Sequence, residues 1–189
     1  MSRGSRLDHS DQPPHRLLGS RELARDGRLA MVRDEVEWPG GDRGAYRWFR
    51  ATSAAFIVPL LHDGSTVLVR QWRYPWRETS WEVPAGTLEA DEEPLAGARR
   101  ELEEEAGLRA AEWTLLGVLR PSALLDSRQF LFLARAVSEV ERAPEAYERD
   151  MITRRLPFVE ALDEALDGGI AHATAVAALC RAARVLGRI

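Results

Sequence analysis

The sequence predicts an α+β domain with a small β subdomain at its N-terminal side. Three observations lead to this prediction: apolar and polar residues alternate between turn residues near the N-terminus, one helical stretch lies among short apolar strands in the middle, and two helical stretches lie at the C-terminal end. The chain has 189 residues, which fits one main domain with an appendage, since a domain contains roughly 150 residues.

The N-terminal part is expected to form a tail and a β subdomain. Residues 1–16 are polar and predict a flexible tail. Residues 17–50 predict short strands. The stretch 29–38 alternates in part and ends at the turn residues 39–42, and 45–52 then carries aromatic side chains at alternating positions. This pattern is typical of a hairpin.

The main domain is expected to span residues 51–189. Residues 54–61 form an apolar run of strand length, and 66–74 predict a second strand after the turn residues Asp63 and Gly64, so that the pair indicates a hairpin. The stretch 80–86 predicts a further short strand that ends in proline and glycine residues.

Residues 94–106 predict a helix. Pro94 suits its first turn, because proline presets the helical φ angle and lacks an N–H that would have no partner there. Gly107 suits the position just after the helix, where the left-handed conformation is common. The apolar stretches 113–120 and 130–137 predict two more strands, with a loop between them.

Two helices are expected at the C-terminal end. Residues 158–167 have helical periodicity and are followed by Gly168 and Gly169, which are typical of the end of a helix. Residues 171–186 form an alanine-rich amphipathic stretch, which predicts a second helix.

Composition narrows the function classes. The formal net charge is −4, so a general nucleic-acid-binding surface, which needs a basic face, is not expected. The longest apolar run, 54–61, is far shorter than the roughly 20 residues of a membrane span. The N-terminus has no apolar core of a secretory signal, and the single cysteine, Cys180, is compatible with a reducing compartment. We therefore expect a cytoplasmic protein without a membrane or nucleic-acid partner.

Three carboxylates lie on one face of the predicted helix. Glu101, Glu104 and Glu105 are spaced i, i+3 and i+4, so they repel one another unless a cation neutralises them. A hard divalent cation with oxygen ligands would do so. The alternative is a solvated acidic helix face, which is common in glutamate-rich helices. The fixed spacing of these residues from Gly86 and Arg100 favours the metal site.

The segment 86–108 resembles the Nudix box, G-x5-E-x7-R-E-U-x-E-E-x-G-U, where U is a bulky aliphatic residue. Every specified position is filled, by Gly86, Glu92, Arg100, Glu101, Leu102, Glu104, Glu105, Gly107 and Leu108. The stretches 70–75 and 81–86, and more weakly 168–182, are similar to the ADP-ribose pyrophosphatase branch of this family. The resemblance implies a mixed α/β/α sandwich.

The resemblance also implies a Mg²⁺ cofactor, with Mn²⁺ as an alternative. Glu101 and Glu105 would be the principal metal ligands, and Glu104 would share a second metal or its water shell. Through the metal, Glu104 and Glu105 would take part in catalysis. The backbone carbonyl of Ala85 would be a further ligand, and Glu82 would bind beside the metals or hold the loop.

Substrate contacts are implied in the same way. Arg73, with Arg70 beside it in the sequence, would bind the diphosphate, and Trp48 would stack on the base. Arg100 would hold the glutamates of the box in place. Three other residues would have structural roles in the motif: Gly86, Glu92 and Gly107.

The loop 120–129 departs from the branch, whose loop carries a glycine and a glutamate that positions or deprotonates the attacking water. Asp126 is the acidic residue of this loop and our candidate for that catalytic role, with Glu145 or Glu148 as alternatives. His172, like His62, has no metal-ligand spacing around it, so we expect a structural or surface histidine.

The expected function is hydrolysis of a nucleoside diphosphate sugar, with ADP-ribose, cleaved to AMP and ribose 5-phosphate, as the first choice. Two alternatives stay open: another diphosphate such as GDP-mannose or a dinucleotide, and a catalytically silent domain that senses such ligands. By resemblance, and because a small β subdomain buries little by itself, we expect a homodimer with residues 17–50 at the interface.

Overall fold

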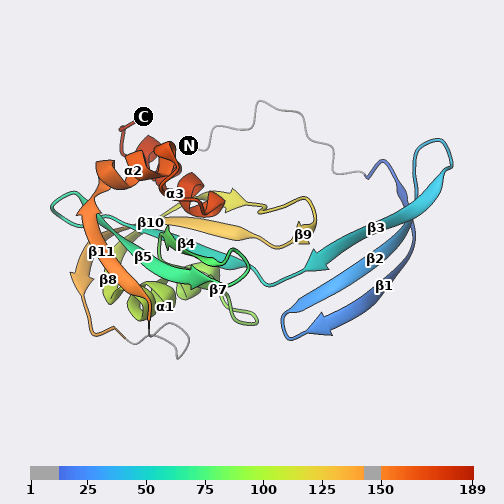
Figure 1. Ribbon diagram of the computed structural model, residues 1–189, viewed down its shortest axis with the longest axis horizontal. Helices are drawn as coiled ribbons and strands as arrows, with labels where there is room; N and C mark the ends of the chain where they lie inside the picture. Colours follow the sequence, from blue (N-terminus) through green and yellow to red (C-terminus); the bar gives the residue numbers. More distant parts are fainter. Residues whose placement is uncertain (1–12, 143–149) are drawn as a thin grey trace. The chain divides into compact units, whose positions relative to one another are not determined.

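A computed structural model describes residues 13–142 and 150–189 of the chain (Figure 1). The protein consists of two compact units. Unit 1 runs to Ala51 and includes Leu124–Asp126, and unit 2 contains residues 52–123 and 127–189. Most of the predicted N-terminal tail lies outside the described residues.

Unit 1 contains a four-stranded sheet in the order β1-β2-β3-β9. Its strands are β1 (Arg16–Asp26), β2 (Leu29–Glu37), β3 (Arg43–Arg50) and the short β9 (Leu125–Asp126). The first three strands are antiparallel neighbours, and β9 pairs in parallel with the end of β3. The predicted strands and the turn between β2 and β3 are confirmed, since the Trp38 amide donates to the Asp42 carbonyl at 2.8 Å.

Unit 2 contains two sheets. One has the order β7-β4-β10-β8, and the other has the order β11-β5-β6. The strands of the first are β4 (Ala54–Pro59), β7 (Ala85–Thr87), β8 (Leu108–Leu119) and β10 (Gln129–Glu139). Those of the second are β5 (Ser65–Arg73), β6 (Glu78–Glu82) and β11 (Ile152–Pro157).

Three helices cover these sheets, α1 (Pro94–Ala106), α2 (Phe158–Asp167) and α3 (Ala173–Val185). Figure 1 shows α1 on one side of the strands of unit 2 and α2 and α3 on the other. This arrangement confirms the predicted mixed α/β/α sandwich. Within residues 13–142 and 150–189, no helix has the length and apolar character that a membrane span requires.

Strand β4 shows why the sandwich forms. Its residues are apolar without a polar alternate, as expected for a strand with both faces covered. Ala55 and Ile57 pack in the core that contains α1, whereas Phe56 and Val58 pack in the core that contains α2 and α3. A buried strand with helices on both sides therefore lies at the centre of unit 2.

The predicted hairpin of residues 54–74 is wrong, although both of its strands form. A tight turn joins β4 to β5, and in it the Leu61 amide donates to the Ser65 carbonyl at 2.9 Å. However, β4 pairs with β7 and β10, and β5 pairs with β6 and β11. Strands from distant parts of the sequence occupy both edges of β4, so β5 begins the second sheet.

Three further boundaries differ from the predictions. The predicted strand 80–86 is divided at Pro84 into β6 and β7, because proline cannot donate to a ladder. Strand β8 starts directly after the helix cap, earlier than expected. The sequence does not predict strand β11, because five of its six residues are exposed and it contains two arginines instead of an apolar run.

The ends of α1 lie where the sequence predicts them. Pro94 occupies the first turn, and Gly107 has a left-handed conformation with φ of 63° and donates to the carbonyls of Glu103 and Leu102. These ends fix which residues face the sheets. Leu102 and the glutamates Glu101 and Glu105 are buried on that face.

Candidate functional site

Two carboxylates of α1 are buried against unit 2. Glu105 is 1% exposed and Glu101 is 5% exposed, whereas the side chain of Glu104 is 26% exposed. Burial of a carboxylate is costly unless hydrogen bonds or opposite charges compensate it. The surroundings of these two side chains therefore decide what the site can do.

The backbone of β7 approaches both buried carboxylates. A Cβ atom added to Gly86 would overlap the carboxylate of Glu101. The amide of Ala85 donates to Oε2 of Glu105 at 2.7 Å. The need for glycine at position 86 is therefore a need for space and not for a left-handed backbone. The metal role of the Ala85 carbonyl stays a prediction.

Arg100 connects four acceptors beside this contact. Its guanidinium donates to both oxygens of Glu92 at 3.1 and 3.0 Å, to Glu101 at 2.7 Å, to Glu104 at 3.0 Å and to the Thr87 carbonyl at 3.1 Å. The hydrogen bonds to Glu92 first, and then the contacts with Glu101 and Glu104, raise the pKa of Arg100 although its partial burial lowers it. Arg100 thus connects the loop that precedes α1, through Thr87 and Glu92, to the acidic face of the helix.

A second arginine–carboxylate pair lies on the strands β5 and β6. Arg73 donates through Nε and Nη2 to the two oxygens of Glu82, at 2.7 and 2.5 Å, and Glu82 is fully buried. Burial alone would lower the pKa of Arg73, but the hydrogen bonds and charge of Glu82 and the charge of Glu105 raise it. The Arg73 guanidinium therefore stays charged, and it lies within electrostatic reach of Glu105 on α1.

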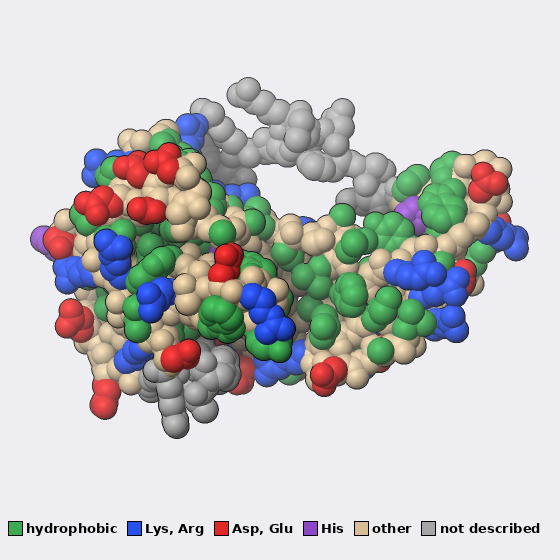
Figure 2. Space-filling view, viewed as in Figure 1, with side chains coloured by type: hydrophobic (Ala, Val, Ile, Leu, Met, Phe, Trp, Pro, Cys, Tyr) green, Lys and Arg blue, Asp and Glu red, His purple; other side chains and the backbone are tan. Residues whose placement is uncertain are grey.

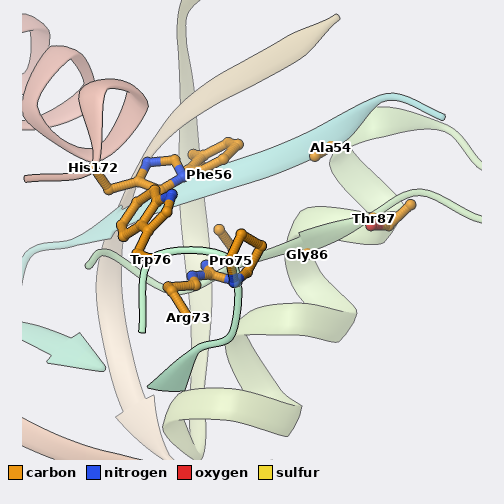
Figure 3. A pocket seen from close by; sticks show the side chains of 9 residues that line it. Ala54, Phe56, Arg73, Pro75, Trp76, Gly86, Thr87 and His172 are labelled. Atoms are coloured by element: carbon orange, nitrogen blue, oxygen red, sulfur yellow. The ribbon is translucent and has the colours of Figure 1, made fainter. Parts of the chain in front are cut away.

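A cavity of about 360 Å³ opens beside this pair (Figure 3). Its lining combines the Arg73 guanidinium with an aromatic wall and with the backbone that precedes α1. The lining residues are Ala54, Phe56, Arg73, Pro75, Trp76, Ala85, Gly86, Thr87 and His172. The lining of the cavity thus includes both the β7 backbone that contacts the carboxylates and the positively charged Arg73.

The structure does not bring Arg70 to this cavity. Arg73 and Glu82 share one face of the β5–β6 ladder, and Arg70 lies on the opposite face, paired with Trp81. The Arg70 guanidinium stands 5.7 Å from the centroid of the Trp81 ring. Of the two arginines expected to bind the diphosphate, only Arg73 lines the cavity.

Two predicted site residues belong to unit 1. Trp48 lies on β3 and donates from Nε1 to Oδ2 of Asp34 at 2.7 Å. Asp126 lies on β9, and its carbonyl accepts the Ala51 amide at 3.3 Å. Their roles in base stacking and in catalysis stay predictions. The alternative acids Glu145 and Glu148 lie outside the described residues.

The sequence does not assign His172 and Trp76 to the site. It predicts a structural or surface histidine at position 172, but His172 lines the cavity as the N-cap of α3. Trp76 lies in the turn after β5, where its amide donates to the Arg73 carbonyl at 2.9 Å. The signal available in the sequence is the position of Trp76 three residues after Arg73. Nothing local points to His172.

The donor chemistry of the site fits a divalent cation. Glu82, Glu92 and the three glutamates of the acidic helix face give five formal negative charges, and Arg73 and Arg100 give two positive ones. Hard cations prefer such carboxylate oxygens. Among the residues that the structure describes, no three acidic, histidine or cysteine side chains already converge on one point. Arg100 holds Glu101 and Glu104, which with Glu105 are the residues that would hold a cation.

Comparison with known proteins gives consistent results. A family model described as the NUDIX domain matches residues 50–178. The ADP-ribose pyrophosphatase of Mycobacterium tuberculosis is 35% identical over 164 residues, which cover 85% of this chain and 79% of that protein. The ADP-ribose pyrophosphatase of Bacillus subtilis is 31% identical over 138 residues, covering 72% of this chain and 71% of that protein.

A solved structure also matches. The crystal structure of an ADP compounds hydrolase superposes with a TM-score of 0.82 and 22% identity, covering 96% of this chain and all of that chain. At this level of identity the match shows the fold.

Substitution of Gly86 by alanine should damage the cation site more than the fold. The added Cβ displaces the Glu101 carboxylate, which is the end of a flexible side chain. We expect Mn²⁺ affinity, measured by electron paramagnetic resonance, to fall about tenfold or more. The free energy of unfolding should change by less than about 2 kcal/mol.

Gly19→Ala is the matched control, because a Cβ at Gly19 on β1 meets no atom within 4 Å. Wild-type Mn²⁺ affinity in a folded Gly86→Ala variant would show that the close approach of Glu101 to β7 has no part in cation binding.

Proposed function

The chain belongs to the Nudix family of pyrophosphohydrolases, and from this premise we propose that it hydrolyses the diphosphate of ADP-ribose to AMP and ribose 5-phosphate. The observation that carries the proposal is the position of the buried Glu101 and Glu105 on the helix face that meets β7, beside a cavity that contains Arg73. Relatives at 31% and 35% identity are named ADP-ribose pyrophosphatases, which supports this substrate.

The reaction adds water to one phosphorus atom of the diphosphate and breaks the bond from that phosphorus to the bridging oxygen, which leaves with the second phosphate. Nudix hydrolases generally need a divalent metal, and we propose Mg²⁺, which when bound would neutralise phosphate oxygens and lower the pKa of the attacking water. Glu101 and Glu105 would hold it, with Glu104 at the more exposed side.

Arg73 would bind the diphosphate through charge and hydrogen bonds. Its Nε and Nη2 atoms donate to Glu82, and the guanidinium carries five donors, so further N–H groups are available to the cavity that Arg73 lines. Glu82 holds the guanidinium in place from the buried side. A positive charge that is fixed in advance needs little reorganisation when an anionic substrate binds.

The alternatives are distinguished by the substrate. A silent sensor would bind ADP-ribose without cleaving it, and an enzyme for another diphosphate would cleave GDP-mannose or a dinucleotide faster. The complete set of carboxylates that we assign to the cation favours an active enzyme over a sensor. A cytoplasmic location remains our prediction.

The direct test is phosphate-ester release from ADP-ribose, GDP-mannose and a dinucleotide in the presence of Mg²⁺, with Glu105→Gln as the comparison. The substitution keeps the side-chain size and can still accept from the Ala85 amide, but it removes a charge from the metal-binding set. We expect turnover to fall by several orders of magnitude with little change in the thermal unfolding temperature. Near-normal hydrolysis by Glu105→Gln would refute the metal assignment, and failure of the wild type on ADP-ribose would refute the substrate.

Asp126 is our proposed general base. It is one methylene shorter than the glutamate of related loops, so we expect Asp126→Asn to lower kcat/KM by roughly ten- to a hundredfold, against the 10²–10⁴ typical of a committed base. The measurement uses the same three substrates. Wild-type rates on all three would leave Asp126 without a catalytic role and direct the search to Glu145, Glu148 or a glutamate of the box.

We further propose a homodimer with unit 1 at the interface. The described residues of unit 1 form strands and turns without a helix to cover them. Figure 2 shows hydrophobic side chains gathered over these strands. The large exposed ones are Leu17, Leu18, Leu23, Leu29, Trp38, Tyr46 and Phe49. Apolar side chains collected on one small sheet indicate an interaction surface.

Sedimentation at micromolar concentration tests the dimer. We expect a mass of twice the 21.2 kDa of one chain. The double substitution of Leu17 and Tyr46 by glutamate should give monomers, because it places charges on the apolar surface. The control is Leu166→Glu on α2, where the leucine is 58% exposed. A wild-type monomer with full activity would contradict the proposal.

A further inference from the structure

We propose that His172 is a substrate-binding residue that determines specificity, and that its Nε2–H group donates to an oxygen atom of the substrate inside the cavity beside Arg73. The inference rests on the proposed function and extends it to the part of the nucleoside diphosphate sugar that enters this cavity. Figure 3 shows the His172 ring between Phe56 and Trp76 on the wall of the cavity, with Arg73 below.

The N-cap position fixes which nitrogen of His172 carries the proton. The Ala175 amide in the first turn of α3 donates to Nδ1 at 3.4 Å. Because Nδ1 accepts this hydrogen bond, the proton of a neutral ring lies on Nε2. Burial lowers the pKa of His172, the charge of Glu82 opposes this and the charge of Arg73 adds to it. The lowered pKa favours the neutral ring, in which Nε2 is the donor.

Two aromatic rings fix the direction of the donor. The centroid of the imidazole lies 5.4 Å from that of Phe56 and 5.8 Å from that of Trp76, with tilts of 33° and 41°. Phe56 comes from the central strand β4. Trp76 is held by its turn, in which the Arg77 amide also donates to the Arg73 carbonyl, with a left-handed φ of 60° at Arg77. A side chain held from three directions loses little entropy on binding.

The Nε2–H group has no acceptor at hydrogen-bond distance within residues 13–142 and 150–189. Oε2 of Glu82 lies 3.8 Å from Nε2, and both oxygens of Glu82 already accept from Arg73. The side chain of His172 is 19% exposed, so its Nε2–H group can be reached from the cavity. Here the donor lies at the wall of a cavity, so an oxygen of the bound substrate is the partner that completes it.

The Nε2–H group of His172 needs an oxygen acceptor, which is either a hydroxyl of the terminal sugar or an oxygen of the diphosphate. A neutral donor next to a guanidinium adds direction without adding charge. It therefore discriminates between substrates by where their oxygens lie, while Arg73 supplies the attraction that all diphosphates share.

Two variants with different structural defects test the proposal. His172→Asn keeps an N-cap acceptor but has a shorter side chain that cannot place a donor where Nε2–H stands. His172→Phe keeps the ring between Phe56 and Trp76 but removes the donor and the cap. Their shared defect is the missing donor. His62→Asn, at an exposed histidine in the turn after β4, is the control.

We expect KM for ADP-ribose to rise roughly 3- to 30-fold in both variants, which is the loss of one hydrogen bond, with a smaller change in kcat and with wild-type values for His62→Asn. Calorimetric binding of ADP-ribose in the Glu105→Gln background should show the same loss, which an effect on turnover alone would not produce.

An ADP-ribose analogue without one hydroxyl on the terminal ribose separates the two acceptors. If His172 binds that hydroxyl, the effects of the analogue and of His172→Asn will not add, and if it binds a diphosphate oxygen, they will add. Non-additive effects support the contact with the hydroxyl. Additive effects, together with the raised KM of both variants, support the contact with the diphosphate.

Wild-type KM and wild-type affinity in a folded His172→Asn or His172→Phe variant would overturn it. If the wild-type enzyme does not cleave ADP-ribose, the proposed substrate fails and not this inference, and the same variants are then measured on the substrate of the panel that is cleaved fastest.

Discussion

Close packing of the α1 carboxylates against the backbone of β7 is the contact on which the rest of the site depends. Glu101 can lie on this backbone because residue 86 has no Cβ, and Glu105 is fixed there by the Ala85 amide. The helix reaches this position because Leu102, on the same face, is fully buried in the core beneath the central strand. The apolar packing that forms the sandwich therefore also positions the acidic side chains.

That contact brings several carboxylates close together, and two arginines compensate part of their mutual repulsion. Arg100 binds Glu92, Glu101 and Glu104, and Arg73 binds the fully buried Glu82. Leaving a buried charge without its partner costs about 3–5 kcal/mol, so the pair of Arg73 with the fully buried Glu82 stabilises the fold. Two guanidinium groups do not balance five carboxylates, and the remaining negative charge is what a divalent cation would neutralise.

The lining of the cavity combines groups of different chemistry. Arg73 offers charge, the backbone before α1 offers the edge of the proposed cation site, and Phe56, Trp76 and His172 offer a rigid wall. These groups come from separate segments of unit 2, so the cavity forms only when the sandwich is assembled. The loop with Asp126 is held differently, because β9 adds it to the sheet of unit 1.

Local signals along the chain are enough to predict several features of the protein. The ends of α1 follow from Pro94 and Gly107, and the order of the glutamates follows from helical spacing, because a helix repeats every few residues whatever surrounds it. The box also identified the family. Its residues lie on one loop and one helix that follow each other in the chain, so their spacing can be read from the sequence.

The pairings between distant segments follow from the folded chain and not from local signals. The tertiary structure placed Arg73 and not Arg70 at the cavity, separated β4 from β5, and brought His172 to the wall of the site. Which strand pairs with which, and which face of a strand meets a helix, depend on contacts between residues far apart in the chain. The sequence near an arginine or a histidine does not predict these contacts, because the residue has the same local conformational preferences on either face of a sheet.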